Sequence, residues 1–295
     1  MPALDAGGVS LYYEEAGEGE TVVLVHGTVS DHTMWKPWVE TLSPAFRTIT
    51  YGRRYAHPNV RQGDVTDSTV ENNAGDLDAL VDEVGGGKVH LAGHSYGGFI
   101  AAYYALKHPQ KLRSLTLINA AVVPMLVRSP GVTGSISLLF RAPAAATSGT
   151  RVMNAAKATW KAAERGDSSA AMKLFVPAVD GRKDLPHWPA GFDAMATRNA
   201  RTVREVTLPS PHVGRTEARR IGVPTLVMYG GLSAPWDRMI SRRLAESIPG
   251  AEEAAIQGAS HMCPVEKPTE TSQKVLEFQR AHSGPHVNFD STWNP

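Results

Sequence analysis

Residues 89–98 read Val-His-Leu-Ala-Gly-His-Ser-Tyr-Gly-Gly, and this stretch is the strongest indication of the fold. A strand is predicted over Lys88–Ala92 and a helix over Gly97–His108, which places Ser95 on the sharp turn between them. Glycines two positions on either side of the serine relieve the crowding of such a turn. The N–H groups that begin a helix favour a developing anion beside the hydroxyl. The pattern predicts a nucleophile at Ser95; an ordinary glycine-rich turn is the alternative.

Strand-like and helix-like segments alternate on both sides of this turn. The strand candidates include continuous apolar runs, which are typical of strands buried on both faces of a parallel sheet. Helical periodicity lies between them, so we expect an α/β fold with a mostly parallel central sheet flanked by helices. The remaining predicted strands are Val9–Glu15, Thr21–Val25, Arg47–Tyr51, Ser114–Ile118, Pro224–Tyr229 and Ala251–Ile256, and the remaining predicted helices are Asn73–Val84, Arg238–Ile248 and Pro268–His282.

One long stretch, residues 122–220, interrupts the alternation. It is rich in Ala, Ser, Pro and Gly and predicts helices, including Arg151–Arg165 and Ser168–Phe175, without a convincing buried strand. Because the sheet resumes at Pro224, we interpret this stretch as an insertion; a separate small domain is the alternative. The predicted division is a core of residues 1–121 and 221–282, a helical lid (cap) of residues 122–220 and a polar C-terminal tail of residues 283–295.

Composition limits the partners and the compartment. The 295 residues carry a net charge of +1, which gives no case for nucleic acid or an anionic membrane as partner. The single cysteine, Cys263, allows no intramolecular disulfide and fits a reducing compartment. The N-terminus has no basic region followed by an apolar stretch, and no apolar run is long enough to cross a bilayer. We expect a cytoplasmic protein that acts on a small molecule.

A second motif, His26-Gly27-Thr28, directly follows the predicted strand Thr21–Val25. The carboxyl ends of parallel strands meet at one edge of the sheet, where open α/β sheets place their sites. The loop should therefore lie beside Ser95, and the backbone N–H groups of Thr28 and Tyr96 are expected to form an oxyanion hole. The His26 imidazole is interpreted as a buried structural side chain.

A third motif, Gly258-Ala259-Ser260-His261, lies between the last predicted strand and the last helix. A loop at the carboxyl end of a strand can bring an imidazole within hydrogen-bonding reach of a serine hydroxyl. The chain has 11 histidines, and most of them need have no chemical role. The position after the final strand favours His261 as the general base.

Taken in order along the chain, these motifs resemble the α/β-hydrolase superfamily. The matching residues are His26-Gly27, the turn at residues 93–97, and Gly258-x-x-His261 followed by Glu266-x-Pro268, and a helical insertion after Ile118 matches the lid position of that family. The resemblance implies hydrolysis of an ester, thioester, amide, lactone or C–C bond without a cofactor. Serine at the nucleophile position limits the likeness to epoxide hydrolases and dehalogenases, which use aspartate there, to the fold.

The third member of a triad is the point at which the match fails. The family's usual acid position, after the strand Pro224–Tyr229, is occupied by Ser233, and Asp237 is the only carboxylate nearby. Asp237 could instead stabilise the start of the next helix. The other position used by relatives holds Asn119, which could orient a histidine without supplying a charge. We predict Asp237 as the acid, with Asn119 as the alternative orienter and a serine–histidine dyad with water as a further one.

Two further clusters do not support a metal or phosphate site. Asp64, Asp67 and Glu71 lack histidine or other ligands at set spacing, so a solvated loop is the simpler interpretation. The glycines at 85–87 precede a strand and not a helix, unlike a phosphate-binding loop. No metal or cofactor is therefore expected.

The sequence thus predicts a serine hydrolase that cleaves a small or medium apolar ester or lactone through an acyl-enzyme. Two rivals remain. One is a cofactor-free lyase, cyclase or oxygenase that uses His261 as a base on a carbon acid. The other is a ligand-binding protein without catalytic activity, which the irregular acid position favours.

Overall fold

A computed structural model describes residues 3–59, 65–85, 87–127, 132–182 and 188–284. Most of the predicted tail, residues 283–295, and Asp64 of the rejected acidic cluster lie outside these ranges. The description below concerns the described residues.

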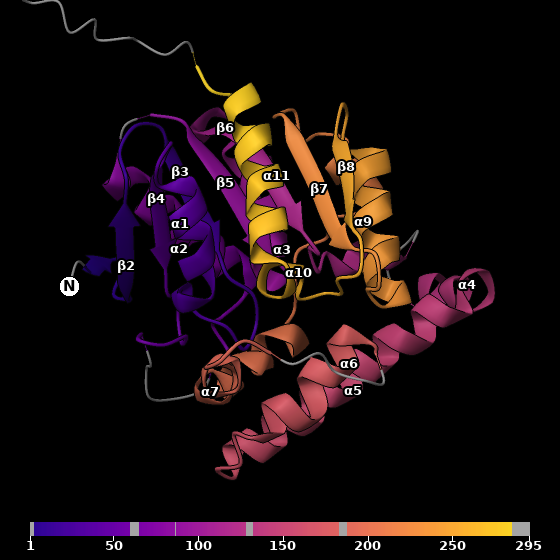
Figure 1. The fold of residues 1–295 in the computed structure, drawn as a ribbon. Coiled ribbons are helices and arrows are strands. Elements are labelled where there is room, and N and C mark those ends of the chain that lie inside the picture. Colours follow the sequence, from indigo (N-terminus) through magenta and orange to yellow (C-terminus); the bar gives the residue numbers. More distant parts are fainter. Residues whose placement is uncertain (1–2, 60–64, 86, 128–131, 183–187, 285–295) are drawn as a thin grey trace, which may run out of the picture.

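The centre of the molecule is an eight-stranded sheet with the order β1-β2-β4-β3-β5-β6-β7-β8 (Figure 1). The pairs β1–β2 and β2–β4 are antiparallel, and the pairs from β4–β3 to β7–β8 are all parallel. The predicted mostly parallel sheet is therefore confirmed. The strands are β1 (Ala3–Asp5), β2 (Ser10–Ala16), β3 (Thr21–Val25), β4 (Arg47–Tyr51), β5 (Val89–His94), β6 (Leu112–Ile118), β7 (Thr225–Gly230) and β8 (Glu252–Ile256).

Helices cover both faces of the sheet. Helices α1 and α11 pack together on one face, and α2 and α3 pack together on the other (Figure 1). The helices of the sheet-bearing part are α1 (Lys36–Leu42), α2 (Val70–Val84), α3 (Tyr96–Lys107), α9 (Pro235–Ser247), α10 (Cys263–Glu266) and α11 (Pro268–Ala281), with 3-10 turns η1 (His32–Trp35) and η2 (Pro109–Lys111).

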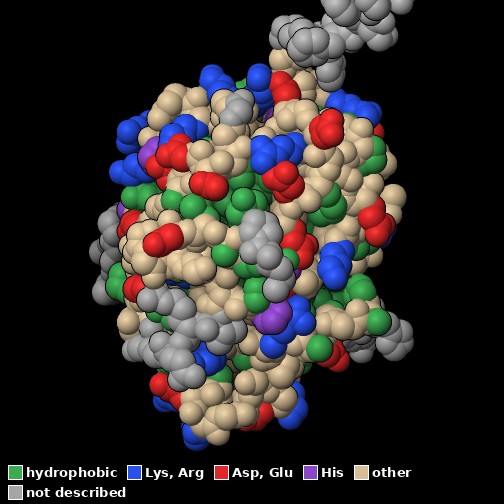
Figure 2. Space-filling model, turned by 90° about the vertical axis from the view of Figure 1, so that its left-hand side faces the viewer, with side chains coloured by type: hydrophobic (Ala, Val, Ile, Leu, Met, Phe, Trp, Pro, Cys, Tyr) green, Lys and Arg blue, Asp and Glu red, His purple; other side chains and the backbone are tan. Residues whose placement is uncertain are grey.

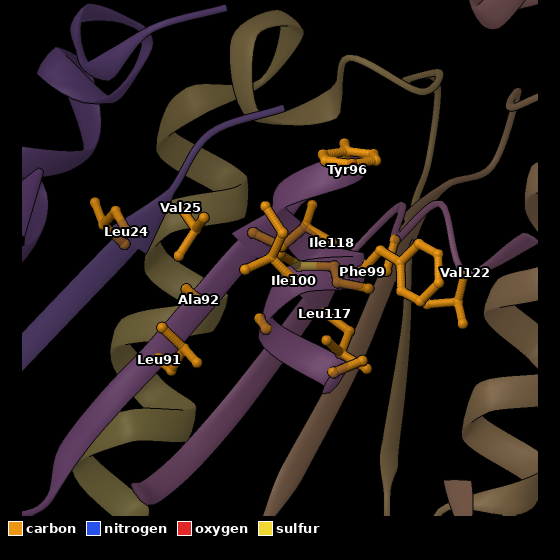
Figure 3. Close-up of a cluster of buried hydrophobic side chains, with 14 of the residues drawn as sticks. Leu24, Val25, Leu91, Ala92, Tyr96, Phe99, Ile100, Leu117, Ile118 and Val122 are labelled. Atoms are coloured by element: carbon orange, nitrogen blue, oxygen red, sulfur yellow. The ribbon is translucent and has the colours of Figure 1, made fainter. Parts of the chain in front are cut away.

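Apolar side chains of the central strands pack against α3 and anchor the turn that carries Ser95 (Figure 3). Leu91, Leu117 and Ile118 from the strands and Phe99 and Ile100 from the helix are all buried. Each fully buried leucine or isoleucine contributes roughly 1.5–3 kcal/mol. The turn is therefore fixed between two elements that are themselves held by the core.

The strand register brings the functional loops to one edge. Val25 of β3 pairs with Gly93 of β5, which pairs with Leu117 of β6. Ile118 then pairs with Met228 of β7. Because these strands are parallel and end at nearly the same level, the segments that follow them begin side by side.

Between β6 and β7 the chain forms helices, which lie beyond the carboxyl edge of the sheet in Figure 1. Within the described part of residues 122–220 there is no strand, as expected. The interpretation of these residues as a separate lid stays a prediction, and we refer to them as the helical insertion. Its elements are the 3-10 turn η3 (Val123–Leu126), α4 (Val132–Arg141), α5 (Pro143–Glu164), the π-helical turn η4 (Ala171–Phe175), α6 (Val176–Asp180), α7 (Phe192–Arg198), the 3-10 helix η5 (Ala200–Thr207) and α8 (Arg215–Ala218).

The main differences from the sequence prediction are at element boundaries. Helix α5 begins at Pro143, eight positions before the predicted start at Arg151, because proline at the first position and the alanines after it suit a helix start. Strand β1 is absent from the predicted strands, since three residues carry too little periodicity.

The surface shows no separation of charge by sign on the face drawn in Figure 2, where basic and acidic side chains are interspersed. No helix among the described residues has the length and apolar character needed to cross a bilayer.

Candidate active site

Ser95 occupies a strained turn directly after β5. Its φ is +54° and its ψ is −119°, a conformation that non-glycine residues rarely adopt. The backbone at residue 95 is held on both sides, since its N–H donates to the Ile118 carbonyl at 3.0 Å and its carbonyl accepts from the Ala121 N–H at 2.9 Å. Residue 95 is half-buried, whereas the residues on both sides of it are buried.

The glycines around Ser95 are required by close backbone approach. A Cβ at residue 97 would lie 2.3 Å from the Val25 carbonyl oxygen and 2.5 Å from that of His26. A Cβ at Gly93 would lie 2.4 Å from the carbonyl oxygen of Gly97. Neither contact can be relieved by moving a side chain, so the turn tolerates only glycine at these positions.

We expect Gly97→Ala to lower the free energy of unfolding by about 3 kcal/mol or more, because the new methyl group overlaps fixed backbone. Urea denaturation followed by circular dichroism measures the effect. Gly75→Ala is the matched control: it lies within α2, where a Cβ would meet open space, and alanine there should stabilise the helix by about 1 kcal/mol. Equal unfolding curves for the two variants would show that the packing argument is wrong.

A hydrogen-bonded chain of three side chains runs from this turn. The Ser95 Oγ lies 2.9 Å from the Nε2 of His261, and the Nδ1 of His261 lies 2.8 Å from the Oδ2 of Asp237. Because an ionised carboxylate can only accept, the imidazole proton lies on Nδ1, and Nε2 is left to accept from the serine hydroxyl. His261 and Asp237 are 1% and 0% exposed, so solvent barely competes for these bonds.

Asp237 combines the two roles that the sequence analysis treated as alternatives. It lies in the first turn of α9, where a carboxylate is favoured by the helix dipole, although Ala234 and not Asp237 is the N-cap residue. The same carboxylate accepts from His261. The structure thus brings together Ser95, His261 and Asp237.

Asn119 lies behind the carboxylate, and no hydrogen bond within the described part of the chain joins it to the imidazole. Its Nδ2 donates to the Oδ2 of Asp237 at 2.7 Å and to the Oγ of Ser233 at 2.9 Å. Its Oδ1 accepts from the Gly230 N–H at 3.2 Å and from the Cys263 thiol at 3.2 Å. The amide therefore links β6 to the loops that carry the acid and the base.

Another histidine supports the His261 loop. The Nε2 of His94 donates to the His261 carbonyl at 2.9 Å, and the two rings are 5.1 Å apart. Burial lowers the pKa of His94 to about 3, so its ring is neutral. On the other side, the Ser260 N–H donates to Glu266 at 2.6 Å and the Ser260 hydroxyl bonds Asp180 of the insertion.

The loop after β3 lies against the nucleophile. A Cβ at Gly27 would be 2.9 Å from the Cβ of Ser95. In the part of the chain that the structure describes, the N–H groups of Thr28 and Tyr96 donate to no other backbone group. They remain the candidates for the predicted oxyanion hole.

His26 has the structural character expected for it. Its Nε2 accepts from the Arg53 N–H at 3.0 Å, and its Nδ1 donates to the Gly27 carbonyl at 2.9 Å. Burial, with the neighbouring Arg53 charge, keeps its pKa well below the usual range. Both ring nitrogens are engaged, so the imidazole cannot serve as a base without breaking the loop.

Sequence reasoning missed a buried ion pair next to this loop, between Arg53 and Glu205. No motif marks either residue, and 152 positions separate them.

The described residues hold no cluster of His, Cys, Asp or Glu suited to a metal ion. Asp67 of the rejected cluster pairs with Arg54 at 3.2 Å.

Comparisons with known proteins add a family match. Residues 22–274 match the model of the alpha/beta hydrolase family. The "Putative carbamate hydrolase RutD" of Azorhizobium caulinodans is 27% identical over 280 residues, covering 94% of this chain and 98% of the relative. The non-heme chloroperoxidase CPO-A1 of Kitasatospora aureofaciens is 28% identical over 282 residues, covering 92% and 96%.

Solved structures agree on the architecture. A thermophilic esterase from Thermogutta terrifontis superposes with a TM-score of 0.75 at 24% identity, covering 96% of this chain and 99% of the esterase. At this identity the likeness concerns the fold. The relatives carry names from different reactions, so the chemistry must be argued from the site.

Proposed function

Because the chain belongs to the alpha/beta hydrolase family, we propose that it is a serine hydrolase that cleaves a small or medium apolar ester or lactone. The observation that carries the proposal is the continuous hydrogen-bonded chain from the Ser95 hydroxyl through His261 to Asp237. A hydroxyl with an adjacent base, itself oriented by a buried carboxylate, is the arrangement required for nucleophilic acyl transfer.

In the proposed acylation step, the Ser95 Oγ attacks the substrate carbonyl carbon while its proton passes to the Nε2 of His261. The carbonyl oxygen becomes an oxyanion, which the N–H groups of Thr28 and Tyr96 stabilise. The protonated imidazole then gives its proton to the leaving alkoxide as the C–O bond breaks. The alcohol departs, or stays tethered if the substrate is a lactone, and an acyl-enzyme remains.

Deacylation repeats the sequence with water. His261 takes a proton from the water as its oxygen attacks the acyl carbon, and then returns a proton to Ser95 as the serine ester bond breaks. Asp237 stabilises the imidazolium that forms in both halves. Each cycle consumes one water and releases one acid, and no cofactor is required.

A preference for apolar substrates is supported by the side chains beside the base. The Trp236 ring lies 5.7 Å from the His261 ring, and Val29 directly follows Thr28 in the oxyanion loop. We treat the helical insertion, residues 122–220, as the lid that shapes the substrate site. A carbamate is a second candidate substrate class, favoured by the likeness to the RutD relative over most of both chains.

The experiment that tests this function is active-site labelling. A fluorophosphonate probe should label the folded protein in a one-to-one ratio, and peptide mass spectrometry should place the label on Ser95. A panel of p-nitrophenyl esters, lactones and aryl carbamates should then show turnover. Ligand binding without labelling or turnover would contradict the proposal and select the non-catalytic rival.

A further inference from the structure

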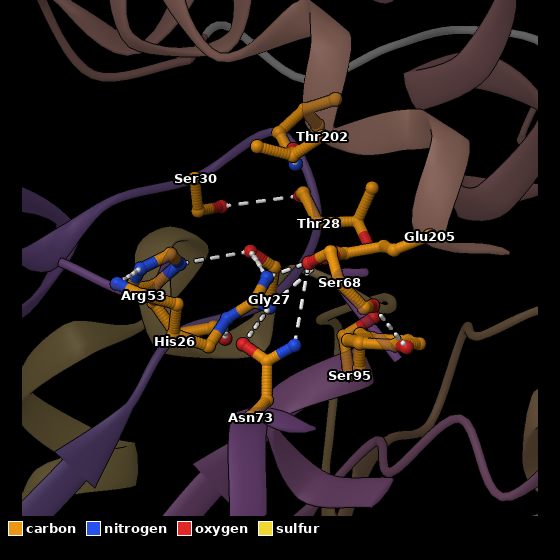
Figure 4. Close-up of polar contacts among 12 residues, drawn as sticks. His26, Gly27, Thr28, Ser30, Arg53, Ser68, Asn73, Ser95, Thr202 and Glu205 are labelled. Atoms are coloured by element: carbon orange, nitrogen blue, oxygen red, sulfur yellow. Dashed lines mark hydrogen bonds and ion pairs between the residues drawn. The ribbon is translucent and has the colours of Figure 1, made fainter. Parts of the chain in front are cut away.

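One segment of the helical insertion is bonded to the loop that carries Thr28 (Figure 4). Residues 198–205 and residues 28–31 are far apart in sequence, yet several hydrogen bonds join the two segments. Thr28 donates to Glu205, the Val29 N–H donates to Thr202, and Asp31 accepts from Asn199 at 2.7 Å and from Arg198 at 2.7 Å. The insertion therefore contacts the loop at several residues, and not at one residue alone.

The acceptor of the Thr28 hydroxyl, Glu205, is also part of a buried ion pair. Arg53 and Glu205 have side chains that are 1% and 0% exposed, with Nη1–Oε2 and Nη2–Oε1 distances of 2.9 and 2.8 Å. Burial alone would lower the pKa of Arg53, but the Glu205 carboxylate raises it above its usual value, so the guanidinium stays charged. Such a bidentate pair fixes both groups in orientation as well as position.

The Glu205 carboxylate also binds two hydroxyl groups. The Oγ1 of Thr28 donates to its Oε1 at 2.5 Å, and the Oγ of Ser68 donates to its Oε2 at 3.2 Å. The Arg53 guanidinium donates in addition to the carbonyls of His26 and Gly27, at 2.9 and 3.1 Å. The residues on either side of the Gly27–Thr28 peptide are thus held by one rigid cluster.

This loop needs to be held because its backbone is strained. Val29 has a φ of +54°, which is costly for a β-branched residue. The Val29 N–H donates to the Thr202 Oγ1 at 2.9 Å, and Val29 directly follows Thr28, whose hydroxyl donates to Glu205. We expect a loop released from the insertion to relax at Val29, which would change the orientation of the neighbouring Thr28 peptide.

We propose that Glu205 is a positioning residue, which acts through the Thr28 hydroxyl to aim the Thr28 N–H at the oxyanion. The inference rests on the proposed hydrolase function and deepens it: the insertion supplies part of the oxyanion geometry as well as covering the site. A mere structural pair would stabilise the fold without affecting the rate at correctly folded sites.

The decisive variant is Thr28→Val, which removes the hydroxyl, keeps the branched shape and leaves Glu205 paired with Arg53. We expect kcat per labelled site to fall about 10-fold with KM changed less than twofold, since a misaimed oxyanion donor weakens transition-state binding. Thr28→Ser restores a hydroxyl and should lie within about twofold of the wild type. The number of active sites is taken from the amount of fluorophosphonate bound when labelling is complete, so unfolded protein does not enter the value of kcat.

Inhibitor affinity separates positioning from stability. An aryl trifluoromethyl ketone adds to Ser95 and forms an oxyanion, whereas the corresponding alcohol does not. Thr28→Val should weaken the ketone about 10-fold and leave the alcohol unchanged. Glu205→Ala should produce the same pattern. The double variant Thr28→Val/Glu205→Ala should be no slower than Glu205→Ala alone, because each single change already removes the same Thr28–Glu205 hydrogen bond.

The matched control is Asp193→Asn, an exposed carboxylate on α7 of the same insertion, which should leave all these quantities unchanged. Wild-type kcat and ketone affinity in Thr28→Val would overturn the proposal even if Glu205→Ala fails to fold. That result, obtained with a wild type that is labelled at Ser95, would leave the hydrolase function standing. Absence of labelling in the wild type would instead overturn both.

Discussion

Ser95→Ala is expected to lower kcat for a p-nitrophenyl ester by about five orders of magnitude, while the protein stays folded. The hydroxyl is the only group of residue 95 that reaches the Nε2 of His261, and alanine offers no atom that can form the acyl-enzyme. The loss should appear in kcat, with KM nearly unchanged, since the ground-state substrate gains little from the hydroxyl. Steady-state kinetics and thermal melting measure the two quantities.

Ser10→Ala is the control, because Ser10 lies exposed on β2 and should have full activity. The comparison with His261→Ala is also informative. If Ser95→Ala kept most of its activity while His261→Ala lost it, the reaction would not pass through an acyl-enzyme. The cofactor-free lyase, cyclase or oxygenase chemistry would then replace hydrolysis.

Asp237→Asn is expected to lower kcat about 10³- to 10⁴-fold. The carboxylate keeps the His261 proton on Nδ1 and stabilises the imidazolium, and an amide does neither. With an amide N–H facing Nδ1, the proton moves to Nε2, and the imidazole can no longer accept from Ser95. The rate per labelled site, measured across pH, tests this expectation.

Asn119→Gly distinguishes the two candidates for the third member. Glycine accepts the φ of +43° at this position, so the change removes the amide with little backbone strain. Asn119 donates to Asp237, and no hydrogen bond among the described residues joins it directly to the His261 ring, so we expect its loss to reduce kcat no more than about 10-fold. A loss as large as that of Asp237→Asn would make Asn119 the effective orienter and contradict our assignment.

Much of the fold was predictable because its signals are local. The boundaries of β3 and β4 agree with the predictions for Thr21–Val25 and Arg47–Tyr51. The first is a nearly continuous apolar run, and the second (Arg-Thr-Ile-Thr-Tyr) is rich in β-branched and aromatic residues, which favour strands. The strand–turn–helix at Ser95 was predictable for the same reason. Strand β1 and the early start of α5 were missed, since one is too short and the other too poor in large apolar residues to show a period.

Motif order alone was enough to predict that Ser95, His261 and the Thr28 loop lie close together, because parallel strands carry their following loops to a common edge of the sheet. The relation of Asp237 to Asn119 emerges only in three dimensions. Both follow strands that end at this edge, and which one meets the imidazole depends on side-chain directions set by α9 and by the Asn119 turn.

Local periodicity and residue type were sufficient to predict the fold class, the order of the loops at the carboxyl edge of the sheet, and the serine and histidine that the structure brings together. They left open whether Asp237 or Asn119 contacts the imidazole, and they gave no sign of which part of the insertion contacts residues 28–31. Contacts such as those between Glu205 and Thr28 join residues 177 positions apart, and they form only when the packed core has fixed both backbones.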